Sequence, residues 1–64
     1  GADLEDTNLQ NSNLAGAFFD NANLKGASLN QANIQKTRFR GALLKGTVWV
    51  NGQVCGIGSM GKCR

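Results

Sequence analysis

A five-residue repeat runs through most of this chain. Residues 2–26 read ADLED, TNLQN, SNLAG, AFFDN and ANLKG, with a large apolar residue at the centre of each block. The same spacing continues onward, and the large apolar column comprises Leu4, Leu9, Leu14, Phe19, Leu24, Leu29, Ile34, Phe39, Leu44 and Trp49. Two positions before each of these stands Ala, Ser or Thr, and the residue in between is mostly short and polar. Such regularity indicates a repetitive architecture.

A period of five fits neither an α-helix nor a long flat strand. On a helix the apolar column would wind around the cylinder and form no stripe. On a strand it would alternate between the two faces, because five is odd. A very short strand followed by a bend resolves the conflict, since the small and the large residue are two apart and share a face. The sequence therefore predicts a coil with apolar residues inside and polar residues outside.

The charged residues indicate how many repeats form one turn of the coil. Three repeats per turn would place acid over acid and base over base, whereas four repeats place opposite charges together. With four, the predicted contacts between successive turns are Glu5 with Lys25, Asp20 with Arg40, Phe18 with Arg38, and Phe19 with Phe39. Contacts of this kind contribute less than about 1 kcal/mol each, but they favour a four-sided coil.

The repeats resemble those of the pentapeptide-repeat family over residues 1 to about 50. The ending, from Trp49 to Arg64, is also similar to that of some cyanobacterial members. The resemblance implies an all-β fold, a right-handed quadrilateral parallel β-helix, in which the central and the small residue of each repeat point inward. Ten repeats correspond to about two and a half coils in residues 1–50, and residues 51–64 are then a Gly-rich C-terminal cap.

Two interpretations of the segment after Val48 remain open. Asn51-Gly52 is typical of a hairpin turn, so Val48–Val54 can form a β-hairpin. Alternatively Asn51-Gly52 is one more corner, and Val54 is an eleventh inward residue in the five-residue register. In either case the last coil has an open end, and the apolar residues available to cover it are Trp49, Ile57 and Met60.

Cys55 and Cys63 are the two cysteines of the chain. They are either idle thiols or a disulfide that closes the Gly-rich tail into a loop, and we expect the disulfide because the spacing allows it and glycines impose no stiffness. A bridge would indicate an oxidising compartment, such as a periplasm or a thylakoid lumen. The sequence Gly56-Ile57-Gly58-Ser59-Met60-Gly61 matches a dinucleotide-binding pattern, but the helix and the acidic residue that this pattern requires do not follow it.

The composition argues against catalysis. The 64 residues include no His, and the 4 acidic residues lie on outward positions without a nucleophile or base beside them. We therefore expect neither enzyme activity nor a cofactor or metal site. No apolar stretch approaches the ~20 residues of a membrane span.

The favoured function is a structural or protein-interaction module, because rigid solenoid faces suit docking. The open N-terminal coil end also offers an edge on which a second copy can stack as a homodimer. The alternative is a nucleic-acid-associated role for the basic run Lys36, Arg38, Arg40 and Lys45 around Phe39. Some family members mimic DNA and inhibit gyrase, but they resemble long acidic rods, whereas this chain is short with a net charge of +3.

Overall fold

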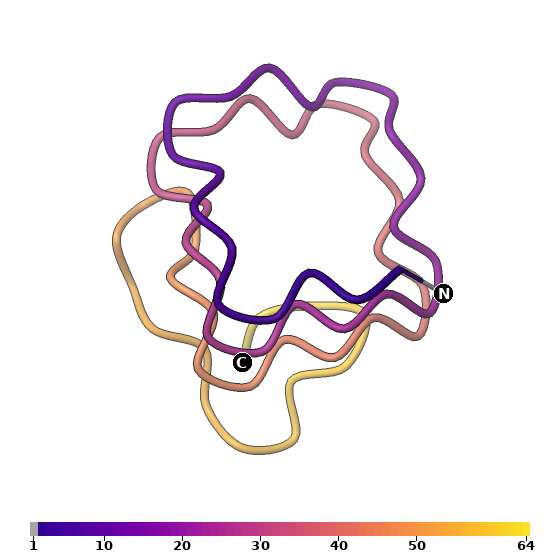
Figure 1. The fold of residues 1–64 in the computed structure, drawn as a ribbon, viewed down its shortest axis with the longest axis vertical. Helices are drawn as coiled ribbons and strands as arrows, with labels where there is room; N and C mark the ends of the chain where they lie inside the picture. The colour runs from indigo at the N-terminus through magenta and orange to yellow at the C-terminus, as the bar shows by residue number, and fades with distance from the viewer. Residues whose placement is uncertain (1) are drawn as a thin grey trace.

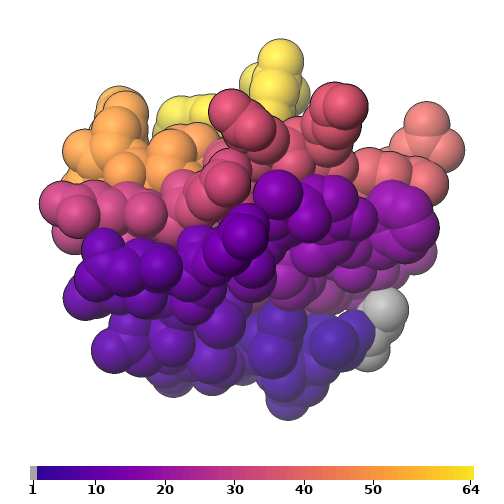
Figure 2. All heavy atoms as spheres, turned by 90° about the horizontal axis from the view of Figure 1, so that it is seen from above, coloured from indigo at the N-terminus to yellow at the C-terminus, as the bar shows by residue number. Residues whose placement is uncertain are grey.

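The computed structural model of this protein describes residues 2–64, which form a stack of windings around a common interior (Figure 1). Within this range there is no helix, and the extended segments are single bridge residues separated by turns. Seen from the side, the windings lie in layers from the N-terminal residues at one end to the C-terminal tail at the other (Figure 2). The molecule measures 25 × 22 × 18 Å along its principal axes.

Successive windings are joined by parallel bridges between residues twenty positions apart. These bridges are Asp3–Asn23, Asn8–Ser28, Asn13–Asn33, Phe18–Arg38, Asn23–Leu43 and Ser28–Val48. Backbone hydrogen bonds accompany each bridge; for example, the amide of Leu4 donates to the carbonyl of Asn23 at 2.8 Å, and the amide of Asn23 donates to the carbonyl of Ala2 at 2.8 Å. One winding therefore contains four repeats, and the backbone groups on its edge are satisfied by the next winding.

Each corner of the coil is a tight turn with a left-handed residue. At the first corner, Asp6 has φ 61° and the amide of Thr7 donates to the carbonyl of Leu4 at 3.1 Å. A positive φ at the third position of such a turn is the signature of type II and favours Gly or Asn. The column accordingly contains Gly16, Gly26, Gly41 and Gly46 together with Asn11 and Asn21, but also Gln31 and Lys36.

Lys36 occupies one of these left-handed corners without a side chain suited to it, with φ 59°. We expect Lys36→Gly to raise the free energy of unfolding by about 0.5–1 kcal/mol, because the relief of backbone strain exceeds the added entropy of the unfolded chain. Urea denaturation measures the change. The matched control, Ala15→Gly, lies at a corner residue without positive φ and should lower stability instead. Equal losses in both variants would contradict this account.

The short polar column between the small and large residues stabilises the corners. The Oδ1 atom of Asn8 accepts a hydrogen bond from the amide of Gln10 at 3.0 Å, and the Oδ1 atom of Asn23 accepts one from the amide of Lys25 at 3.1 Å. These Asx contacts explain why Asp and Asn are favoured here. Phe18 and Leu43 occupy the same column without this capability, and they are 71% and 37% exposed.

The core is concentrated in the second winding and above it. Leu24, Leu29 and Leu44 are fully buried. Residues of the first winding and three other large residues are half-buried and pack against this core; they are Leu4, Leu9, Leu14, Phe19, Ile34, Trp49 and Val50. The first winding is less buried because no further winding lies beneath it among the described residues. An exposed coil edge of this kind can serve as a template for pairing.

Thr47 is buried in the column of small residues, and its Oγ1 atom donates to the carbonyl of Leu24 at 2.6 Å. We expect Thr47→Val to lower the free energy of unfolding by about 1 kcal/mol, since the hydrogen bond is lost while the shape is kept. Thr37 makes the same contact to the carbonyl of Leu14 at 2.8 Å in a half-buried position, so Thr37→Val should cost less. Equilibrium denaturation compares the two variants, and an equal or reversed order would contradict the explanation.

The chain reverses after the last complete corner. Val48 and Val54 form an antiparallel bridge, the amide of Trp49 donates to the carbonyl of Gln53 at 2.7 Å, and Gly52 has φ 84°. The predicted hairpin is thus confirmed. The alternative that Val54 is an eleventh inward residue is wrong, because the turn sends Val54 outward, where it is 60% exposed.

The tail then returns along a neighbouring side of the coil. Leu43 and Met60 form an antiparallel bridge, and the amide of Leu44 donates to the carbonyl of Ser59 at 3.0 Å. These two antiparallel pairings cover part of the C-terminal edge. The prediction that Ile57 and Met60 cover the open end is wrong: their side chains are exposed, because bridge geometry turns Cys55 and Ser59 inward in their place.

Candidate functional site

The C-terminal tail is held by contacts around the two cysteines. The sulfur atoms of Cys55 and Cys63 lie 2.07 Å apart, and their Cα atoms are separated by 4.9 Å. Cys55 is buried in the core cluster, and the amide of Gly56 donates to the carbonyl of Arg64 at 3.0 Å. Trp49 lies against Phe39, with ring centroids 5.2 Å apart. The residues of the dinucleotide-like pattern, Gly56 to Gly61, belong to this tail, and no helix follows them in the described part of the chain.

Three polar side-chain contacts between windings follow a different register from the predicted one. Glu5 accepts a hydrogen bond from Asn23 at 3.1 Å, Gln10 donates to Ser28 at 3.2 Å, and Arg38 donates to Asp20 at 2.6 Å, all across eighteen residues. The prediction matched Glu5 with Lys25 and Asp20 with Arg40, twenty residues apart. The difference arises because a corner side chain reaches the outward residue of the next winding, which precedes the stacked corner by two positions.

Phe18, Asp20 and Arg38 form an exposed cluster on one side of the coil. The guanidinium carbon of Arg38 lies 4.9 Å from the centroid of the Phe18 ring, which confirms the predicted cation–π contact. Phe19 and Phe39 stack inside the coil with centroids 5.5 Å apart, as predicted. Phe39 is 8% exposed, so its ring is not available for stacking on a base within the basic run.

Charge is segregated along the coil axis. All four acidic residues of the chain lie between positions 3 and 20, and all seven basic residues lie between positions 25 and 64. Since the windings stack in sequence order (Figure 2), the N-terminal end is acidic and the C-terminal end is basic. This arrangement gives the two ends of the coil different electrostatic preferences for a partner.

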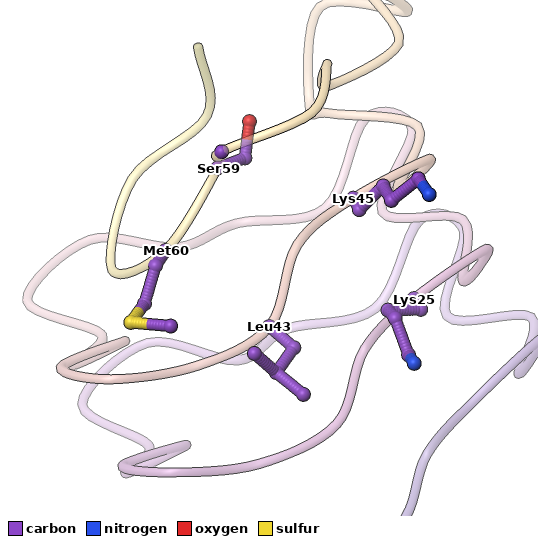
Figure 3. Close-up of a pocket in the computed structure, with 6 residues that line it drawn as sticks. Lys25, Leu43, Lys45, Ser59 and Met60 are labelled. Carbon is purple, nitrogen blue, oxygen red and sulfur yellow. The ribbon is translucent and has the colours of Figure 1, made fainter.

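A pocket of ≈ 420 Å³ opens on the basic part of the molecule (Figure 3). It is lined by Lys25, Leu43, Lys45, Gly58, Ser59 and Met60. Figure 3 shows the two lysines one above the other, beside Leu43, with Met60 of the returning tail on the other side of Leu43. The pocket thus combines two ammonium groups with two apolar side chains at the surface.

Part of this pocket could have been found from the sequence. The four-repeat register places Lys25 and Lys45 at the same corner of successive windings, and Leu43 interrupts a polar column. The position of Met60 could not be inferred, because the five-residue register ends before the tail reverses direction. Met60 was predicted to help cover the open end of the coil, not to lie beside Leu43.

Within the described residues, 2–64, no group of three or more His, Cys, Asp or Glu side chains could hold a metal ion. No helix in this range is long and apolar enough to cross a membrane.

The chain belongs to the pentapeptide-repeat family. The family model for pentapeptide repeats matches residues 2–41 in 8 copies, which is more than half of the chain. Repeats of this family form β-helical solenoids and generally serve as structural or interaction modules rather than enzymes. The chain matches no curated protein and no solved structure.

Proposed function

We propose that this protein is a non-enzymatic structural module that binds a partner protein through the outward faces of its coil. In this proposal the coil is a right-handed quadrilateral β-helix of about two and a half turns, assigned to residues 1–50, of which Gly1 lies outside the described residues. Residues 51–64 form the cap, closed by the Cys55–Cys63 disulfide. The inward columns supply rigidity, which leaves the outward positions free to vary with the partner.

The observation that carries the proposal is the exposure of large apolar residues in a column that is otherwise polar. Phe18 and Leu43 stand where Asp3, Asn8 and Asn23 stabilise corners, so they contribute less to the local fold than a polar residue would. Exposed apolar side chains beside charged groups are typical of protein interaction sites. The exposed Phe18 and Leu43 are therefore better explained by contact with a partner protein than by a contribution to the stability of the fold.

The partner that this proposal favours is a different protein rather than a second copy stacked N-terminus to N-terminus. Such a homodimer would bury the open edge, but it would also bring together the acidic ends of two copies, with four acidic residues each. Repulsion between like charges opposes that arrangement. The nucleic-acid alternative receives no support, because Phe39 is buried and Arg38 already contacts Asp20 and Phe18.

The proposed disulfide also bears on the compartment. A cap that depends on Cys55–Cys63 would persist in an oxidising space and open in a reducing one. We therefore propose an oxidising compartment, such as a periplasm or a thylakoid lumen.

Affinity capture from the cells that express the chain, read by quantitative mass spectrometry, tests the interaction function. The bait is the wild-type protein, and the comparison is Phe18→Asn combined with Leu43→Asn, which restores the polar column. We expect at least one protein to be retained by the wild type and reduced about tenfold by the double variant, since apolar contacts dominate such surfaces. Ala15→Asn, an exposed corner change, is the matched control. Equal capture by all three folded baits, or none by any, would refute the proposal.

A further inference from the structure

The pocket formed by Lys25, the third winding and the tail is lined by two lysines and by no carboxylate. Within residues 2–64, no ion pair joins Lys25 or Lys45 to a carboxylate. The two lysines lie on successive windings, whose backbones are about 4.8 Å apart. Glu5 and Asp6 lie at the corner one winding below Lys25. Glu5 accepts a hydrogen bond from Asn23, and the carboxylate of Asp6 lies beside Gly26. A carboxylate from outside the chain would relieve the repulsion between the two ammonium groups.

The floor of the same pocket is apolar and adaptable. Leu43 forms a bridge with Asn23 of the winding below. The polar Asn23 shows that the fold does not require an apolar residue at this position of a winding. The antiparallel backbone bridge places Met60 beside Leu43, and Met60 is 58% exposed. A thioether side chain adapts to differently shaped apolar groups. The floor can therefore receive one apolar side chain beside the two positive charges.

These features favour a peptide over other anionic ligands. A single-stranded nucleic acid would be expected to stack on aromatic rings, and no aromatic residue lines the pocket. A membrane surface would be expected to meet a larger basic cluster, whereas the pocket presents two lysines. An extended peptide, in contrast, can present an apolar side chain flanked by carboxylates within a few residues.

We propose that Lys25, Leu43, Lys45 and Met60 form a docking groove for an acidic segment of a partner protein. The apolar side chain of the segment packs on Leu43 and Met60, and its flanking carboxylates pair with the two lysines. This inference rests on the interaction function proposed above and specifies one surface for it.

The test uses a short blocked peptide, Gly-Ser-Glu-Glu-Leu-Glu-Asp-Ser-Gly, titrated into the isotopically labelled full chain under non-reducing conditions. Nuclear magnetic resonance reports both the affinity and the residues that respond. We expect the amide shifts to be largest at the four groove residues. A peptide with Gln and Asn in place of Glu and Asp should bind about tenfold more weakly, because two ion pairs are lost. Raising the salt concentration should weaken the acidic peptide only.

Matched variants separate the groove from the rest of the basic surface. Lys25→Gln combined with Lys45→Gln should weaken the acidic peptide about tenfold, and Leu43→Asn, which copies the residue in the winding below, should weaken it several-fold. Lys36→Gln removes one charge elsewhere and should have no effect. Shifts centred on Phe18 and Arg38, or equal binding of the neutral peptide, would overturn the proposal.

Further outcomes distinguish this inference from the broader function. Tighter binding at the groove by a dT oligonucleotide, or by phosphatidylglycerol–phosphatidylcholine vesicles, would overturn the assignment to a peptide. Suppose that Phe18→Asn alone reduces partner capture, Leu43→Asn alone does not, and the peptide does not bind. This result would overturn the groove and leave the interaction function standing. If the wild-type protein captures no partner at all, the interaction function itself is overturned.

Discussion

Leu24→Asp is expected to unfold the protein. Leu24 is completely buried in the second winding, in the same inward column as Leu4 and Leu44, with a winding on either side. A carboxylate there has no charged partner and loses its hydration, at a cost of several kcal/mol. A domain of 64 residues has a total stability of only about 3–10 kcal/mol, so the substitution removes most or all of it.

Circular dichroism and thermal melting measure this effect. The variant should show a disordered spectrum without a cooperative transition, whereas Ala15→Asp places the same carboxylate on an exposed corner and should melt like the wild type. Asp20 already occupies the equivalent corner position one repeat later, which shows that an acid is tolerated there. A native spectrum and an unchanged melting temperature for Leu24→Asp would contradict the inward assignment of this column.

Opening the link between Cys55 and Cys63 is expected to destabilise the C-terminal end before the rest of the coil. The two residues are eight positions apart, and closing a loop of that size contributes about 2–3 kcal/mol by restricting the unfolded chain. The loop between the two cysteines contains Gly56, Gly58 and Gly61, which lose much conformational entropy on ordering. Without the bond, the segment should detach from the edge that it covers at Leu43 and Leu44.

Amide hydrogen exchange measures which part of the chain is destabilised first. After reduction, the amides of Cys55 and Gly61 should exchange faster, while those of Leu24 and Leu29 change less, and the melting temperature should fall. The double variant Cys55→Ser with Cys63→Ser should behave like the reduced protein, and reductant should not affect it further. Intact mass under non-reducing conditions provides the direct check, since the bridged chain is about two mass units lighter than the dithiol. Two free thiols in protein isolated without reductant would contradict the disulfide.

The coil could be predicted from the sequence because interactions within each five-residue repeat determine its conformation. Each repeat of five residues contains two inward residues, one outward polar residue between them and a corner. The conformation of each position depends on residues within the same repeat. The apolar column from Leu4 to Trp49 therefore indicated a coil. Opposite charges twenty residues apart indicated four repeats per turn, which agrees with the bridges between windings.

The side-chain partners were decided by tertiary structure. Asp20 receives the guanidinium of Arg38 because a corner side chain reaches the outward face of the next winding, and only the three-dimensional offset between corner and face reveals this. The exposure of Val54 depends likewise on the reversal at Gly52, which decides between the two interpretations that the sequence left open.

The docking groove combines residues whose positions follow from the repeat with one residue that only the tertiary structure places. The sequence alone determined that Lys25 and Lys45 share a corner and that Leu43 faces outward, because both follow from the repeat. Only the tertiary structure brought Met60 beside Leu43, since the antiparallel return of the tail depends on backbone pairing with a winding seventeen residues away in the chain. Local periodicity specifies a repetitive coil, but non-local pairing at its end, where the periodicity stops, decides the surface that a partner meets.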